Sequence, residues 1–109
     1  MILNVTVDDQ TIRVSVPEEL IQEAEELYSR MDADMDKGWQ MSRTWVESPD
    51  TYQRCQVAAD KVLGALHQDN RNLMMLWSGY ILSRMPGVGE VVVDTKGDIT
   101  ETVILGEAP

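Results

Sequence analysis

The sequence predicts a single α+β domain with the element order ββαααββ: a β-hairpin, a three-helix core and a C-terminal β-hairpin. Near both ends of the chain, apolar residues alternate with polar ones, which is the period of a strand buried on one face. Between these ends, apolar residues recur every three or four positions, as in amphipathic helices. The length of 109 residues matches the usual domain size of about 100–150 residues. Residues 1–109 are therefore expected to form one domain.

Residues 3–16 are expected to form the first β-hairpin. Six apolar residues alternate with polar ones along this segment: Leu3, Val5, Val7, Ile12, Val14 and Val16. Pairing Val7 with Ile12 places all six on one face and leaves residues 8–11 as a loop. A hairpin with one apolar face requires another layer to cover it.

Residues 17–36 are predicted to form an amphipathic helix that stops at Gly38. Pro17 suits its first position. The apolar stripe consists of Leu20, Ile21, Ala24, Leu27, Tyr28 and Met31. The opposite face carries Glu18, Glu19, Glu23, Glu25, Glu26 and Arg30. This acidic face is interpreted as solvated or, alternatively, as a docking face for a basic partner that would contact Glu19, Glu23 and Glu26.

Residues 39–47 (WQMSRTWVE) place Trp39, Met41, Arg43 and Trp45 at alternate positions. In an extended segment, a period of two puts both indole rings on one side. In one interpretation the tryptophans cover the three-helix core as a lid. In the other they are exposed anchors at an interface or ligand site, because Trp and Arg are typical of binding hot spots.

Two further helices are expected, from Ser48 to about Gln68 and from about Asn70 to Arg84. Ser48 followed by Pro49 is a strong helix start, and Asp69 or Asn70 can cap the last helix. The helix from Ser48 to Gln68 has an apolar stripe on one side. Its other positions are polar: Gln53, Arg54, Gln56, Asp60, Lys61 and Gln68. In the second, the run 73–82 (LMMLWSGYIL) is apolar on nearly all sides and predicts a central buried helix.

The C-terminal segment repeats the alternating pattern and predicts a second hairpin that turns at Lys96-Gly97-Asp98. One face would carry Val91, Val93, Ile99, Val103 and Leu105, and the other Val92 and Ile104. Residues 106–109 are expected to be a loose end. The two hairpins can join as one four-stranded antiparallel sheet with the helices on one face. Alternatively, their edges can pair with a second copy, which favours a homodimer.

Acidic residues dominate the charge, with a net value of −10. Residues 17–36 contribute −7, whereas residues 71–88 contribute +2. A negative field repels phosphate backbones, so no direct binding of nucleic acid is expected. No apolar run approaches the length of about 20 residues that a membrane span needs. The N-terminal residues do not resemble a signal peptide, and there is one cysteine. A cytoplasmic protein without membrane association is therefore expected.

No residue pattern indicates catalysis or a cofactor. Asp32, Asp34 and Asp36 resemble the start of a calcium loop, but Lys37 and Arg43 occupy the positions of the required Gly and Glu. They remain a weak candidate metal site. Cys55 and His67 would lie about 18 Å apart along one helix, too far for a nucleophile pair. Known phosphate-binding and hydrolase motifs do not occur.

These observations favour a non-enzymatic protein-interaction module that self-associates or binds a basic protein. Its contact residues would be Trp39, Arg43 and Trp45 together with the acidic face. The alternative is a domain that binds a small anion or aromatic ligand, or a modest enzyme, with its pocket near the same two tryptophans. Arg43 would then anchor the anion, because it is the one charge between two aromatic residues.

Overall fold

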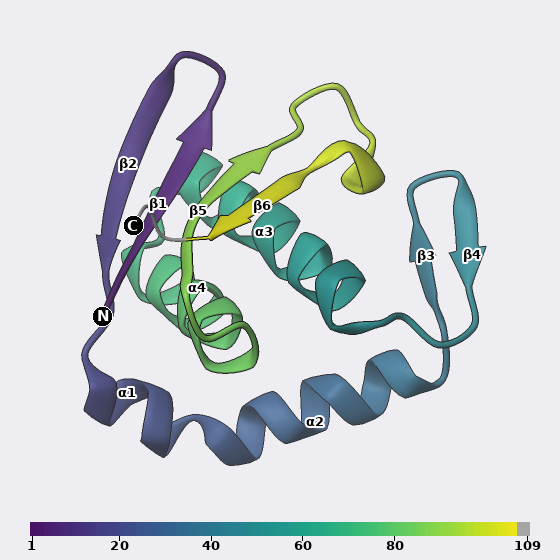
Figure 1. Ribbon diagram of the computed structural model, residues 1–109, viewed down its shortest axis with the longest axis horizontal. Coiled ribbons are helices and arrows are strands. Elements are labelled where there is room, and N and C mark those ends of the chain that lie inside the picture. The colour runs from purple at the N-terminus through teal and green to yellow at the C-terminus, as the bar shows by residue number, and fades with distance from the viewer. Residues whose placement is uncertain (107–109) are drawn as a thin grey trace.

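The computed structural model describes residues 1–106 and contains one four-stranded sheet, one layer of helices and one small separate hairpin (Figure 1). The sheet has the order β2-β1-β5-β6, with strands β1 (Ile2–Val7), β2 (Gln10–Ser15), β5 (Val88–Val93) and β6 (Val103–Gly106). The small hairpin consists of β3 (Trp39–Met41) and β4 (Thr44–Val46). The helices are α1 (Glu18–Glu23), α2 (Glu25–Asp36), α3 (Thr51–His67) and α4 (Arg71–Arg84), with a short 3-10 helix η1 (Ile99–Glu101). The predicted α+β class is confirmed, and residues 107–109 of the expected loose end lie outside the described residues.

The two terminal hairpins join in one sheet, as predicted, but the sheet is mixed. β1 pairs antiparallel with β2, and β5 with β6. The central strands β1 and β5 run parallel, with Val5 opposite Val91, so the expectation of an entirely antiparallel sheet was wrong. A parallel pair requires a long crossover connection, and the helices between β2 and β5 provide it. Residue pattern identifies the apolar face of a strand, whereas strand direction depends on how the intervening helices cross the sheet.

The first hairpin has a tighter turn than the sequence predicted. Val5 lies opposite Ile12 and Val7 opposite Gln10, which leaves two residues in the loop rather than four. Asp8 adopts a φ of 53° there, a left-handed conformation that short hairpin turns require. Because side chains alternate with a period of two, this two-residue shift in pairing leaves the same residues on the buried face.

The predicted faces of β6 were wrong. Ile104 lies opposite Val91 and is buried, whereas Val103 and Leu105 are exposed on the other face. The connection from 94 to 102 includes η1 and does not continue the strand alternation. When the alternation of β5 is continued through this segment, each residue of β6 is therefore assigned to the wrong face of the sheet.

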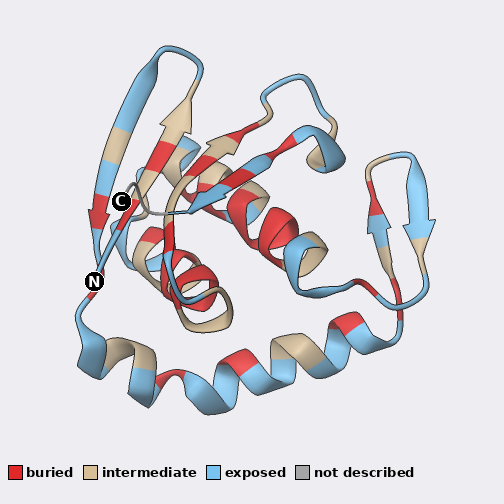
Figure 2. Ribbon diagram, viewed as in Figure 1, coloured by how far each residue is buried: buried red, intermediate tan, exposed pale blue. Residues whose placement is uncertain are grey.

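The helices cover one face of the sheet, and buried residues lie where the two layers meet (Figure 2). α4 contributes much of this core through Met74, Tyr80, Ile81 and Leu82, although its first turns are partly exposed. Gly79 allows Tyr28 of α2 to approach α4 closely, because a Cβ at this position would collide with the Tyr28 hydroxyl.

The helix predicted over 17–36 is divided at Ala24 into α1 and α2. α3 begins later than expected: Asp50, rather than Ser48, is its N-cap. The Asp50 side chain accepts a hydrogen bond from the Gln53 N–H at 2.8 Å, and the Gln53 side chain accepts one from the Asp50 N–H at 2.9 Å. This reciprocal capping box satisfies two N–H groups at once. The predicted Asn70 cap of α4 is confirmed.

Candidate functional site

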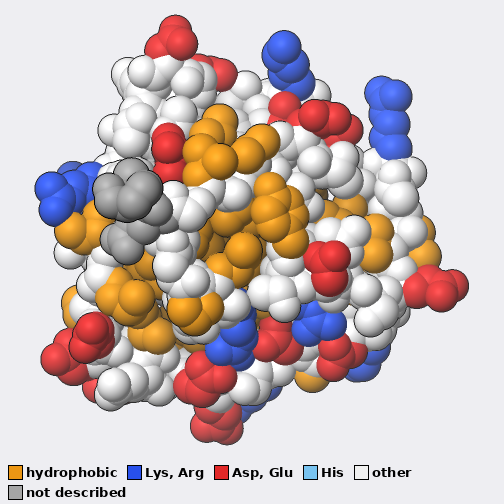
Figure 3. Space-filling model, in the orientation of Figure 1, with side chains coloured by type: hydrophobic (Ala, Val, Ile, Leu, Met, Phe, Trp, Pro, Cys, Tyr) orange, Lys and Arg blue, Asp and Glu red, His pale blue; other side chains and the backbone are white. Residues whose placement is uncertain are grey.

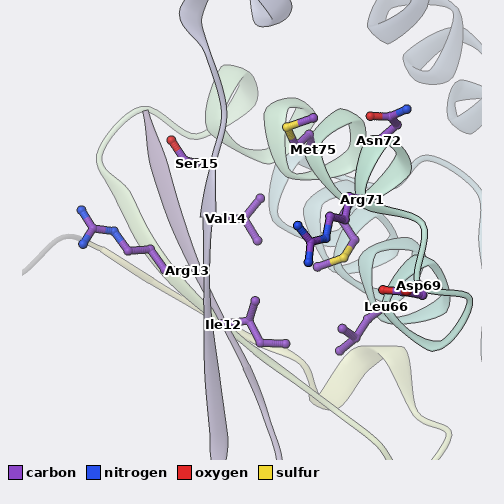
Figure 4. A pocket seen from close by; sticks show the side chains of 10 residues that line it. Ile12, Arg13, Val14, Ser15, Leu66, Asp69, Arg71, Asn72 and Met75 are labelled. Atoms are coloured by element: carbon purple, nitrogen blue, oxygen red, sulfur yellow. The ribbon is translucent and has the colours of Figure 1, made fainter.

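An apolar pocket of about 620 Å³ lies between β2 and the adjoining ends of α3 and α4 (Figure 4). Its apolar wall consists of Ile12, Val14, Leu66, Met74 and Met75. Figure 4 shows Ile12 and Val14 pointing from β2 towards the helices, whereas Arg13 and Ser15 point away from them. Arg71 extends from the start of α4 into the space beside Val14. The pocket is therefore apolar inside and carries a cation at its margin.

The pocket lies beside the open edge of the sheet, because β2 is an outermost strand. Residues on paired antiparallel strands alternate between those that exchange two hydrogen bonds and those that exchange none. Met1 and Val16 exchange two, each with an N···O distance of 2.7 Å. By this alternation, the backbone groups of Thr11, Arg13 and Ser15 point away from β1. No other strand of the described chain pairs with them.

The opposite edge, β6, is covered by side chains of α3. The Ile104 N–H donates a hydrogen bond to the Tyr52 hydroxyl at 3.0 Å. The Gln56 amide donates to the Thr102 carbonyl at 2.9 Å and to the Thr100 carbonyl at 3.1 Å. Gln56 was expected on the polar side of its helix but is only 5% exposed. It satisfies a carbonyl group of η1 and the carbonyl group of Thr102, the residue immediately before β6.

The face of the sheet opposite the helices exposes apolar residues. Ile2, Val103 and Leu105 are 37%, 43% and 42% exposed. Figure 3 shows hydrophobic side chains gathered over β5 and β6 in the middle of the visible surface. Beside them lies a shallow hollow of about 300 Å³, lined by Ile2, Asn4, Arg13 and Gly89. We call these residues, together with Glu90 and Val92, the outer sheet face.

A cluster of charged and phenolic groups surrounds Asp32 of α2. Its carboxylate accepts hydrogen bonds from the Tyr80 hydroxyl and from Nε of Arg84 at 2.9 Å, and it lies 3.4 Å from Nη1 of Arg54. Arg54 also pairs with Asp36, and Arg84 pairs with Glu25 at 3.0 Å. The hydrogen bond from Arg84 lowers the pKa of Glu25. Burial, and then the hydrogen bond to Asp32, raise the pKa of Tyr80.

The groups of the Asp32 cluster hold the structure together rather than carry out a reaction. Both guanidinium groups are paired with carboxylates, so neither is free to hold an anion in the adjoining pocket of about 290 Å³. Tyr80 stays protonated at neutral pH, as an ordinary tyrosine does, and its raised pKa extends this further into the alkaline range. Burial raises the pKa of the nearby Cys55 thiol to about 12, which makes it a poor nucleophile. We interpret the cluster as a link between α2 and the α3–α4 pair.

Trp39 and Trp45 lie on opposite faces of the small β3–β4 hairpin. Trp39 is opposite Val46, and Trp45 is opposite Gln40. The chain reverses at Ser42-Arg43, so the expectation that both rings share one side was wrong. Trp39 is half-buried against the core, whereas Trp45 is 56% exposed. The lid interpretation therefore applies to Trp39 alone.

The other candidate residues predicted from the sequence do not converge on one pocket. Glu19, Glu23 and Glu26 are exposed on α1 and α2, and residues 39–47 do not line the pocket beside β2, the pocket beside the Asp32 cluster or the hollow over Gly89. Asp32 and Asp36 both contact Arg54. Within the described part of the chain, no three Asp, Glu, His or Cys side chains converge to hold a metal ion.

Sequence reasoning missed the pocket beside β2. Its apolar residues were assigned to the core, and Arg71 was counted only as part of a basic segment. The sequence signal that could have indicated the pocket is the position of Arg71 a few residues before Met74 and Met75 at the start of α4. The sequence matches no protein-family model, and comparisons with curated proteins and with solved structures give no match. Among helices of the described residues, none has the length and apolar character needed to cross a membrane.

Proposed function

We propose that this chain is a non-enzymatic protein-interaction module that self-associates through the outer sheet face. The observation that carries the proposal is the exposure of Val103 and Leu105 of β6, and of Ile2 two strands away on β1, on a face that the helices leave uncovered. Antiparallel strands with one solvated face usually carry polar residues there. An apolar group at this position is typical of a surface that another protein covers.

A second copy of the chain is the occupant that suits this face. In a two-fold dimer, the same patch of both copies meets and must complement itself. The outer sheet face combines the apolar residues of β6 with the hollow over Gly89. On this face, Arg13 of β2 and Glu90 of β5 lie on either side of Asn4 of β1, so the face carries one charge of each sign. Two such faces can stack about 10 Å apart as in a β-sandwich.

Replacement of Leu105 by Glu tests this proposal. The change would bury an unpaired carboxylate in the dimer and should weaken association at least about tenfold. Sedimentation velocity over a concentration series measures the effect. The matched control is Leu27→Glu, because Leu27 is similarly exposed, at 38%, but lies on α2. A monomeric parent protein, or equal weakening by both substitutions, would contradict the proposal.

A basic protein partner at a separate surface is the second part of the proposed function. Trp45 offers a large exposed ring, and Trp and Arg, the latter present as Arg43, are frequent in hot spots. The carboxylates of Glu19, Glu23 and Glu26 supply negative charge for such a partner. Trp39 would support this surface from its half-buried position. A cytoplasmic location is part of the proposal and is supported by the single, buried, unpaired thiol of Cys55.

A further inference from the structure

The open edge of β2 and the pocket beside it form one continuous surface that shares Arg13 with the outer sheet face but otherwise lies apart from it. We propose that this surface binds an extended peptide segment of another protein, added to the sheet as a fifth strand. The bound segment has the pattern apolar–acidic–apolar. The proposal rests on the unpaired backbone of β2, the position of the pocket and the charges beside them.

The backbone of β2 provides the first part of the argument. Thr11, Arg13 and Ser15 direct N–H and C=O groups outward, as the alternation from the Met1–Val16 pair requires. An extended peptide can satisfy these groups by strand addition. α3 prevents strand addition at β6, because Tyr52 and Gln56 already form hydrogen bonds along that edge.

The pocket provides the second part. Neighbouring strands lie about 4.8 Å apart, and side chains on adjacent strands point to the same face where they are opposite. Ile12 and Val14 point towards the helices (Figure 4). Residues of an added strand opposite them would enter the space bounded by Leu66 and Met75. Its volume of about 620 Å³ is within the range of about 300–1,000 Å³ typical of ligand pockets.

The charges determine the pattern of the segment. Arg13 lies between Ile12 and Val14 and points to the opposite face of the sheet. The added residue opposite Arg13 therefore points outward, and its two neighbours point into the pocket. An acid at that position forms a cross-strand pair with Arg13. Arg71 adds a second positive charge at the pocket, where Asp69 is the only acid among the described residues of the lining, although the whole chain carries −10.

A second copy of β2 is a poor occupant of this edge. The strand Gln10–Ser15 contains Arg13 and no acid. In the two-fold register that places Arg13 opposite itself, two arginines would meet without a compensating carboxylate within β2, and like charges across strands are unfavourable. The occupant with matching charge is a segment of a different protein.

The experiment uses a short peptide, capped at both ends, with glutamate at its centre between two valines. Binding is measured by chemical-shift changes of ¹⁵N-labelled protein and by fluorescence polarisation of the labelled peptide. We expect shifts in the amides of Thr11, Arg13 and Ser15 and new protection of these amides from hydrogen exchange. Measurements are repeated with Leu105→Glu, so that peptide binding is assessed separately from the proposed self-association.

Two variants identify the mode of binding. Ser15→Pro removes an outward N–H and should weaken binding about tenfold. Proline is tolerated on an edge strand where the N–H faces solvent, so the fold should persist. Arg13→Glu should weaken binding of the glutamate peptide about fivefold. A peptide with lysine at its centre should recover affinity for Arg13→Glu but bind the unaltered protein weakly.

Three results would overturn the proposal. The first is an absence of shifts in β2 at millimolar peptide. The second is binding that Ser15→Pro leaves unchanged, because this would indicate a pocket ligand that does not use the backbone edge. The third is protection of the β2 amides in the protein alone that disappears on dilution, because this would indicate that a second copy occupies the edge.

Discussion

The two edges of the sheet differ in how their backbone groups are satisfied. At β6, α3 covers the strand and supplies the Tyr52 hydroxyl and the Gln56 amide as hydrogen-bond partners. At β2, the helices lie behind the strand, leave its edge open and enclose an apolar pocket beside it. Open edges favour uncontrolled pairing, so proteins usually cover them. The difference indicates that α3 protects one edge and that the other edge remains accessible for a partner.

Among the side-chain truncations, the largest expected effect is at Gln56, which is needed to satisfy the covered edge. Gln56→Ala leaves the carbonyl groups of Thr100 and Thr102 without this donor. We expect a loss of about 2–3 kcal/mol in the free energy of unfolding, measured by urea denaturation. The native protein should also expose Cys55, on the same helix, to a thiol reagent more readily. Unchanged stability would mean that water satisfies the edge equally well.

A smaller effect is expected from removing one hydroxyl at the same edge. Tyr52→Phe deletes the acceptor of the Ile104 N–H, whose N···O distance is 3.0 Å. Tyr52 is 39% exposed, so water can replace part of this interaction, and the loss should be about 1 kcal/mol. Hydrogen exchange should accelerate at the Ile104 amide and stay unchanged in β1. Equal acceleration across the sheet would indicate a general loss of stability rather than an opened edge.

The smallest effect on stability is expected at the open edge. Ser15→Pro should change the free energy of unfolding by no more than about 0.5 kcal/mol, because the lost N–H does not pair with β1. Val14→Pro is the contrasting variant: it removes a donor to β1 and should cost about 3 kcal/mol or more. Urea denaturation of both variants tests the assignment of inward and outward groups. Similar losses for the two would show that the assignment is wrong.

Local pattern was sufficient for the elements but not for their arrangement. The buried faces of β1 and β2, the two-helix pair α3–α4 and the Asn70 cap could all be predicted, because each depends on residues within a few positions. The faces of β6 could not, because η1 interrupts the alternation between β5 and β6. The two tryptophans were misplaced for a similar reason, since an unrecognised turn at Ser42-Arg43 reverses the chain between them.

The candidate site depends on distant residues, which explains why the sequence did not reveal it. Ile12 and Met75 read as core residues of separate elements, and Arg71 as one charge in a basic segment. They line one pocket only because α4 packs beside β2. Gln56 likewise looked like a residue of a solvated helix face until β6 was placed against α3.

The sequence by itself determined the α+β class, the apolar face of the first hairpin, the cap of α4 at Asn70 and the acidic surface of α1 and α2. These features follow from contacts between residues two to four positions apart. The tertiary structure decided the parallel pairing of β1 with β5, the protection of β6 and the pocket beside the open edge of β2. Those features follow from packing between segments separated by tens of residues, where the periodicity of one segment carries no information about the direction or position of the other.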